Sequence, residues 1–204
     1  FSSYTNPYLD HKEIDEFKRD MPELAFRQEI LGEFLDEVGS VFRNVKDCIK
    51  GALAPPQSGN RYVAGCDLAK HEDFTVVCVL DGNGQLVAFE RFSQLDWVFQ
   101  SKRIVDICQR YNNARLLIDS TGVGDPIYDQ LRRLNMSVEG YKFTNASKKD
   151  LVENLSLAID NKTISFPAIP ELINELGLFG YKISQAGVTT YGAPEGYHDD
   201  TVIA

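Results

Sequence analysis

Four aspartates stand at places in this chain where a carboxylate is unusual. Asp67 ends the apolar run RYVAGCD and Asp119 ends the apolar run RLLID, while Asp199 and Asp200 form an adjacent pair near the last residues. Aspartate has a poor β-propensity and its charge is costly to bury, so each carboxylate needs a compensating partner. No lysine or arginine lies within two residues of Asp67 or Asp119. The partner must therefore come from elsewhere.

A cluster of these four side chains predicts a site for divalent cations. Two carboxylates within about 4 Å repel each other by roughly 4 kcal/mol at an effective dielectric of 20, so a cluster is tolerable only with bound cations or protons. Oxygen ligands without a nearby Cys pair favour Mg²⁺ or Mn²⁺ over zinc. The simpler alternative is that each Asp caps the turn after its strand, and the Ser-Thr-Gly that follows Asp119 fits that role.

Further polar residues flank these four. Asp73 either faces the same metal site or is an ordinary turn residue, and His198 either supports the metal ligands or, as we favour, only begins the last helix. Lys148 and Lys149 follow Ser147, the expected N-cap of a helix, where cations are either solvated or contact a phosphate. The pattern GxxxxGK[ST] is absent, which argues against a P-loop ATPase in this chain.

Composition points to an ordinary globular protein. The 204 residues are 43% hydrophobic and 25% charged, and no apolar run approaches the roughly 20 residues that cross a bilayer. We expect a soluble intracellular protein whose four cysteines, which form no CxxC pair, are reduced core thiols. The net charge of −9 is unfavourable for DNA binding. Residues 61–204 contain 14 Lys plus Arg and 19 Asp plus Glu, which gives this part a net charge of −5. Two divalent cations would nearly cancel that charge.

Hydrophobic periodicity predicts alternating strands and helices after a linker at 51–60. The expected strands are residues 61–69, 73–81, 85–93, 114–121 and 138–144, with a short extended piece at 163–167 and a hairpin formed by 181–185 and 187–192. The expected helices are residues 11–21, a second one after Pro22 through Leu35, then 97–111, 125–134, 147–159 and 170–179. The last residues predict a helix start that stops mid-turn, as in an excised fragment.

This order predicts an α/β fold with a mixed five-stranded sheet and helices on both faces, because a meander extended by right-handed crossovers gives that arrangement. Ligands of such sheets gather beyond the carboxyl ends of the parallel strands. Asp67 and Asp119 lie at such ends.

The segments GCDLAKHEDFTVV, LLIDSTGVGDPIYDQL, SKKDLVENLSLAIDNKTISFP and YHDDTVIA together resemble the C-terminal nuclease domain of the large terminase subunit of tailed bacteriophages. The upstream FRQEILGEF and VF resemble the segment that joins the packaging ATPase of that family to its nuclease. The resemblance implies an RNase H-like, RuvC-type fold over residues 61–204, with an extra hairpin before the last helix. Residues 1–60 would be a helical linker from the ATPase region.

The resemblance also implies a function, namely cutting of concatemeric viral double-stranded DNA during packaging, in the cytoplasm of the infected host. Asp67, Asp119, Asp199 and Asp200 match the catalytic metal ligands of the family, and Asp73 matches an accessory acid. The implied partners are DNA, the ATPase domain of the same full-length chain, the portal and the small terminase subunit, with no membrane. Lys148, Lys149 and Lys182 are the expected DNA contacts.

The expected mechanism is two-metal hydrolysis with Mg²⁺ or Mn²⁺. One ion, shared by Asp67 and the 199–200 pair, would activate a water, and a second ion, between Asp67 and Asp119, would stabilise the leaving 3′ oxygen. Three alternatives stay open from the residues alone. These are a junction resolvase, transposase or integrase with the same fold, an actin-like or sugar-kinase phosphotransferase, and a packaging-motor docking module without catalysis.

Overall fold

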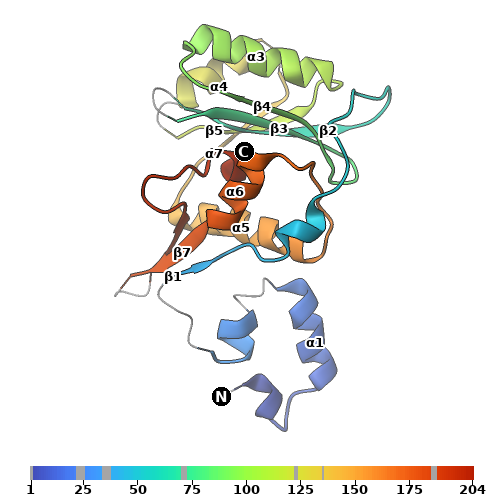
Figure 1. Cartoon of the computed structure of the whole chain (residues 1–204), viewed down its shortest axis with the longest axis vertical. Coiled ribbons are helices and arrows are strands. Elements are labelled where there is room, and N and C mark those ends of the chain that lie inside the picture. The colour runs from blue at the N-terminus through green and yellow to red at the C-terminus, as the bar shows by residue number, and fades with distance from the viewer. Residues whose placement is uncertain are drawn as a thin grey trace.

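The structure is a computed structural model that describes residues 2–21, 26–33, 38–69, 73–121, 124–134, 136–184 and 188–204. Its centre is a five-stranded sheet in the order β4-β3-β2-β5-β6 (Figure 1). The strands are β2 (Tyr62–Asp67), β3 (Thr75–Asp81), β4 (Leu86–Phe92), β5 (Arg115–Asp119) and β6 (Val138–Tyr141). β2, β3 and β4 form an antiparallel meander, and β5 and β6 are added in parallel to β2.

The turn between β3 and β4 shows how local sequence sets this meander. The Asp81 carboxylate accepts hydrogen bonds of 2.9 Å from the backbone N–H groups of Asn83 and Gln85, and Gly84 has a φ of +76° that side chains rarely adopt. A Cβ at Gly84 would also lie 2.3 Å from the Thr163 carbonyl oxygen. This tight turn joins β3 and β4 as a hairpin.

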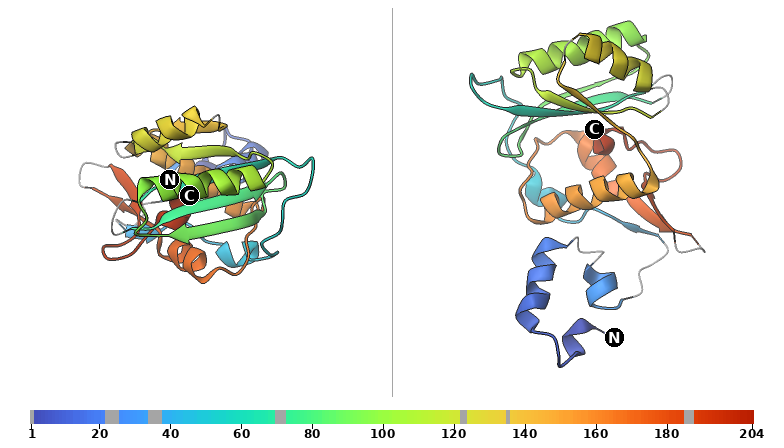
Figure 2. Two further views of the ribbon diagram at one scale, coloured as in Figure 1. Left: turned by 90° about the horizontal axis from the view of Figure 1, so that it is seen from above. Right: turned by 180° about the vertical axis from the view of Figure 1, so that it is seen from behind.

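Two helices cover one face of the sheet, α3 (Trp97–Arg110) and α4 (Gly124–Arg133). The right-hand view of Figure 2 shows them together on the side of the sheet away from the last helices. α3 begins at Asp96, whose side chain accepts from the N–H groups of Val98 and Phe99. Ile104, Leu116 and Leu131 are fully buried in the first hydrophobic core that this layer forms with the sheet.

The opposite face carries α5 (Asn145–Asp160), α6 (Pro170–Leu178) and the short α7 (Asp200–Ile203). Ile159, Leu176 and Phe179 are fully buried in a second core on this side. A small sheet of order β1-β7-β8 borders it, formed by β1 (Val38–Ser40), β7 (Gly180–Ile183) and β8 (Thr189–Gly192). The fold is thus a mixed five-stranded sheet flanked by helices on both faces, with an extra hairpin before the last helix, as the sequence predicted.

The N-terminal part forms a small layer of its own, with η1 (Ser3–Thr5), α1 (His11–Asp20) and a single π-helical turn, η2 (Phe26–Ile30). Figure 1 shows it beyond α5 and β1, on the side away from the five-stranded sheet. The predicted division at residue 60 stays a prediction. Val41–Cys48, which include η3 (Val45–Cys48), contribute four buried side chains to the second core, so that core takes residues from both sides of residue 60.

Several expected elements differ in detail. Ser147 is not the N-cap of α5: Thr144 caps it, and Ser147, at the third helical position, completes a reciprocal capping box. The extended piece at 163–167 makes only isolated bridges, Gln85↔Ser165 and Ile49↔Phe166. The expected helix after Pro22 is described only at η2, and 22–25 and 34–37 lie outside the described residues. Gly122 of the expected tight turn also lies outside them.

The four cysteines are free thiols, as expected. None of the described helices is both long and apolar enough to span a bilayer.

Candidate metal and nuclease site

The first two aspartates of the site end neighbouring parallel strands. β2 and β5 are paired up to Cys66↔Ile118, and the next residues are Asp67 and Asp119. Parallel pairing therefore brings both carboxylates to the same edge of the sheet. The Asp119 carboxylate also accepts a 2.7 Å hydrogen bond from the Thr121 N–H, so it does cap its turn, and one oxygen remains for another partner.

The second pair is brought to that edge by α7, which begins after Asp199 and packs against β2 and β3. This packing is possible because residue 65 is a glycine. An added Cβ at Gly65 would lie 1.9 Å from the carbonyl oxygen of Ala204. The end of α7 thus rests directly on the β2 backbone.

A buried glutamate fixes the start of α7. Glu175 on α6 is 4% exposed, and its Oε2 accepts from the backbone N–H of Thr201 at 2.7 Å and from its hydroxyl at 2.6 Å. The other oxygen of Glu175 faces Arg91 of β4 at 3.6 Å. Thr201 directly follows Asp200, so this network holds the acidic pair in place. The sequence analysis missed Glu175 because a Glu in an amphipathic helix usually faces solvent.

The negative charges of the other three aspartates act on Asp67. Its pKa is raised from 3.8 to about 8, first by burial and then by the negative charges of Asp200, Asp199 and Asp119. The cation of Lys148 lowers it in part. The predicted meeting of the four side chains at one sheet edge is therefore supported by the charges that act on Asp67.

Of the three lysines expected to touch DNA, Lys148 alone lies in this cluster. Its ammonium group is 3.4 Å from Asp199 and 5.8 Å from the centre of the Phe179 ring. Lys149, one residue further, is exposed and pairs with Glu153 at 3.6 Å. Lys182 is exposed on β7.

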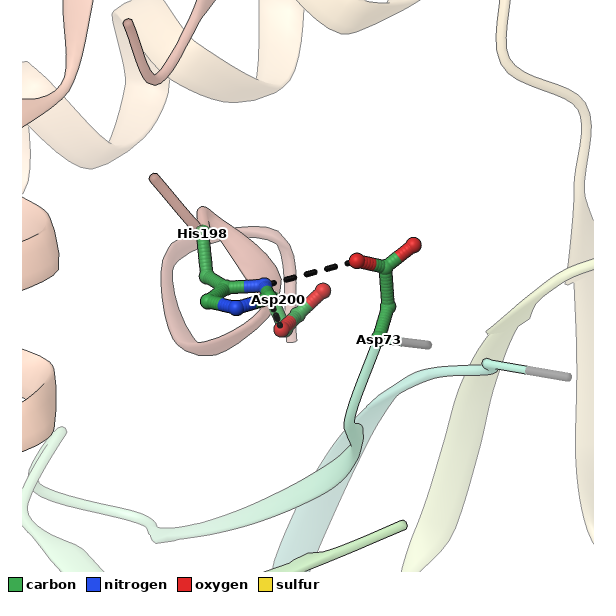
Figure 3. Close-up of side chains that lie close together, drawn as sticks. All are labelled: Asp73, His198 and Asp200. Carbon is green, nitrogen blue, oxygen red and sulfur yellow. Dashed lines mark ion pairs between the residues drawn. The ribbon is translucent and has the colours of Figure 1, made fainter. Parts of the chain in front are cut away.

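The side chains of Asp73, His198 and Asp200 lie close together, as Figure 3 shows. The Nδ1 atom of His198 lies 3.4 Å from an oxygen of Asp73 and 3.5 Å from an oxygen of Asp200. The Phe74 N–H donates to the same Asp200 oxygen at 3.4 Å. Burial raises the pKa of Asp200 to about 6, which this N–H and His198 partly oppose. His198 therefore does more than begin the helix, which corrects the interpretation that we favoured.

The chemistry of these donors fits divalent cations. Desolvation is the first cause of the raised pKa values of both Asp67 and Asp200. Each is close to further carboxylates, and Lys148 is the one cation that lowers the pKa of Asp67. The negative charge of these carboxylates exceeds the positive charge of the side chains beside them. Carboxylate oxygens are the ligands that Mg²⁺ and Mn²⁺ prefer.

A mixed β-meander sheet extended by parallel strands, with carboxylates at the ends of the two central strands, defines an RNase H-like α/β domain. A family model described as "Terminase RNaseH-like domain" matches residues 64–204, more than half of the chain. The chain belongs to this family.

Relatives and solved structures agree with this assignment. The large terminase subunits of Thermus virus P23-45 and Thermus phage G20c are 29% and 28% identical to it in alignments 197 residues long. These alignments cover 90% of this chain and 40% of each relative. The chain therefore spans about two fifths of these relatives.

Among solved structures, the large terminase nuclease of the thermophilic phage G20c with bound cobalt aligns with a TM-score of 0.75 and 24% identity, over 80% of this chain and 93% of that one. The large terminase nuclease domain of Thermus phage P74-26 aligns with a TM-score of 0.73 and 24% identity, over 81% of this chain and 91% of that one. At these identities the structures show that the fold is shared.

Proposed function

We propose that this chain is the nuclease domain of a large terminase subunit and that it cuts concatemeric viral double-stranded DNA during genome packaging by metal-dependent hydrolysis of phosphodiester bonds. The observation that carries the proposal is the burial of Asp67 within reach of the charges of Asp119, Asp199 and Asp200. The G20c large terminase nuclease has been crystallised with bound cobalt, magnesium and zinc, which supports a divalent-metal site in this family.

The proposed cofactor of the four carboxylates is a pair of Mg²⁺ or Mn²⁺ ions. One would be held by Asp67 with the 199–200 pair and the other by Asp67 with Asp119. Bound cations of this kind lower the pKa of a water and neutralise the charge that develops on the leaving oxygen. Asp67 would contribute to both sites, because the charges of Asp200, Asp199 and Asp119 all act on its carboxylate.

The other residues of the site position these ligands. Glu175 holds Thr201 and thereby the 199–200 pair. Gly65 lets α7 lie against β2, so the pair reaches the edge where Asp67 ends. Lys148 balances part of the charge through Asp199 and is placed to meet a DNA phosphate that approaches the cluster.

The chain carries a net charge of −9, so we propose that tight DNA binding belongs to other parts of the packaging machine. The relatives are more than twice as long as this chain, which leaves room for a packaging ATPase domain. A large terminase from a thermophilic bacteriophage, of which this chain matches 52%, has been solved in complex with ADP. The portal and the small terminase subunit are further proposed partners, and the cytoplasm of the infected bacterium is the proposed place of action.

Plasmid digestion tests the nuclease proposal. The parent chain should nick and linearise plasmid in Mn²⁺ or Mg²⁺ and not in EDTA, and Asp67→Asn and Asp119→Ala should each lower the rate at least about 100-fold. Asp150→Asn, on the exposed surface of α5, is the matched control and should cut normally. Normal cleavage by a folded Asp67→Asn protein would refute the assignment.

A strong preference for four-way junctions over linear duplex would instead favour a resolvase.

Variants of the three lysines test which of them contact DNA at the proposed metal site. Lys148→Ala should reduce cleavage more than Lys149→Ala, because only Lys148 reaches the carboxylate cluster. Lys149→Ala and Lys182→Ala should mainly weaken DNA binding and reduce its salt dependence by about one counterion each. Cleavage rates and filter binding between about 0.05 and 0.2 M salt measure both effects. Equal loss of cleavage in the first two variants would remove the special role of Lys148.

A further inference from the structure

A cleft with three arginines lies between α3 and β4, the edge strand of the five-stranded sheet. Its volume is about 470 Å³, and five of the six described residues that line it are charged. The lining residues are Phe89, Glu90, Arg91, Arg103, Asp106 and Arg110. None of these six belongs to the carboxylate cluster proposed for catalysis, so the cleft is a separate feature of the surface.

Two of the arginines are available to a ligand. Among the described residues, neither Arg103 nor Arg110 forms an ion pair, although two carboxylates line the same cleft. The guanidinium carbon of Arg103 lies 5.0 Å from the centre of the Phe92 ring. An aromatic ring beside one face of a guanidinium leaves its N–H groups available to an anion. Arg91 differs, because Glu175 already lies 3.6 Å from its guanidinium.

The positions of Arg103 and Arg110 on α3 suit an extended anion. They are seven residues apart, which is close to two helical turns, so both side chains leave the same face of the helix. A rise of 1.5 Å per residue separates them by about 10 Å along the helix axis. One strand of B-DNA advances about 3.4 Å per phosphate, so this separation spans about three steps of one strand.

One end of the cleft lies towards the proposed metal site. Arg91, near the end of β4, contacts Glu175, which holds the start of α7. Arg110 marks the other end, because the hydroxyl of the next residue, Tyr111, donates to the carbonyl oxygen of Val87 near the start of β4. The cleft therefore runs along β4 away from the metal site.

We propose that Arg103 and Arg110 bind phosphates of the DNA backbone and that the cleft positions one strand of the duplex beyond the carboxylate cluster. This inference rests on the nuclease function proposed above, because it takes DNA as the anion. Guanidinium groups suit phosphate oxygens, and backbone contacts position a duplex without reading its sequence. Glu90 and Asp106 line the same cleft and repel the phosphates, which keeps this binding weak.

Binding of a short fluorescent duplex in EDTA, where no strand is cut, tests the proposal. Arg103→Gln and Arg110→Gln should each weaken binding at least about threefold and lower the slope of log affinity against log salt by about one. Both side chains are exposed, so the fold should persist, which circular dichroism checks. Arg133→Gln, at the exposed end of α4 and outside the cleft, is the matched control and should change neither quantity.

The two acids of the cleft give a result that a merely structural role of the arginines would not produce. Glu90→Gln and Asp106→Asn should each raise the affinity for the duplex, because each removes a negative charge that repels the phosphates. Unchanged or weaker binding by both folded variants would contradict the proposal.

A folded double variant, Arg103→Gln with Arg110→Gln, that keeps the affinity and salt slope of the parent chain would overturn the DNA site. Calorimetry with ADP tests a free phosphate compound as the ligand instead. Arginines that are needed for ADP binding but not for duplex binding would also overturn it.

The nuclease proposal is decided separately. In Mn²⁺, the two arginine variants should raise the KM for plasmid and leave kcat unchanged, since neither residue touches the metal ligands. Duplex binding is measured without cleavage. A chain that binds DNA through these arginines and cuts no plasmid would therefore refute the nuclease function and leave the binding site standing.

Discussion

The buried Asp67 carboxylate makes the stability of the metal-free protein depend on pH in a way that can be calculated. Its pKa is about 8 in the folded chain against an ordinary 3.8. A raised pKa means that the folded state keeps a proton that the unfolded state loses. The stabilisation is complete below about pH 4 and is lost as the pH rises towards about 8. One pKa unit corresponds to a little over 1 kcal/mol, so Asp67 alone should cost about 3 kcal/mol between pH 5 and pH 7.

Replacing Asp67 with Asn isolates this effect, because asparagine does not titrate and has nearly the same shape. In EDTA, the melting temperature of the parent chain should fall between pH 5 and pH 7 by about 5–10 °C more than that of Asp67→Asn. Asp200, with a pKa of about 6, should leave a smaller slope in both proteins below pH 6. Calorimetric or circular-dichroism melts at pH 5, 6 and 7 measure the difference.

Divalent cations should remove this slope, since they replace the proton as the partner of Asp67. The parent chain should therefore be stabilised by Mn²⁺ most strongly at pH 7 and least at pH 5. Parallel pH curves for the parent chain and Asp67→Asn in EDTA would refute the argument, because Asp67 would then be no more buried or crowded by charge than an ordinary aspartate.

Two further variants test what holds α7 in place. Glu175→Ala should lower the free energy of unfolding in urea by about 3 kcal/mol, because it leaves buried donors unpaired. Glu171 is exposed, so Glu171→Ala should change this free energy by less than about 0.5 kcal/mol. Equal effects of the two substitutions would mean that the buried network does not stabilise the fold. Gly65→Ala should cost at least about 2 kcal/mol and reduce cleavage, because its Cβ would collide with the end of α7. Gly82→Ala, with open space around it, should do neither, and a Gly65→Ala protein as stable and active as this control would show that α7 moves freely.

The sequence sufficed for most of the fold because the main strands and helices carry strong periodic signals. The apolar run RLLID predicts a strand, and it forms β5, in which Leu116 and Ile118 are buried. β1 was missed because Val38, Gly39 and Ser40 form only three residues of strand, and they pair with β7 far along the chain. Thr144 and Ser147 are both plausible N-caps, and only the backbone shows which one lies outside the helix.

The sequence predicted the acidic residues of the site but not the residues that hold them in place. Asp67 and Asp119 stand out because a charge at the end of an apolar strand requires an explanation. Glu175 and Phe74 do not stand out, since their roles arise from partners 26 or more positions away, Thr201 and His198. Pairings of this length are a property of the assembled fold and leave no local pattern to detect.

The dependence of the acidic cluster on α7 bears on when the protein becomes competent during synthesis. Asp67 emerges early, yet its companions Asp199 and Asp200 are placed only after α6 has docked and Glu175 has captured Thr201. A nascent or partly folded chain thus carries every ingredient of the centre but no assembled centre. If the chain is the nuclease that we propose, its activity would depend on the docking of α7.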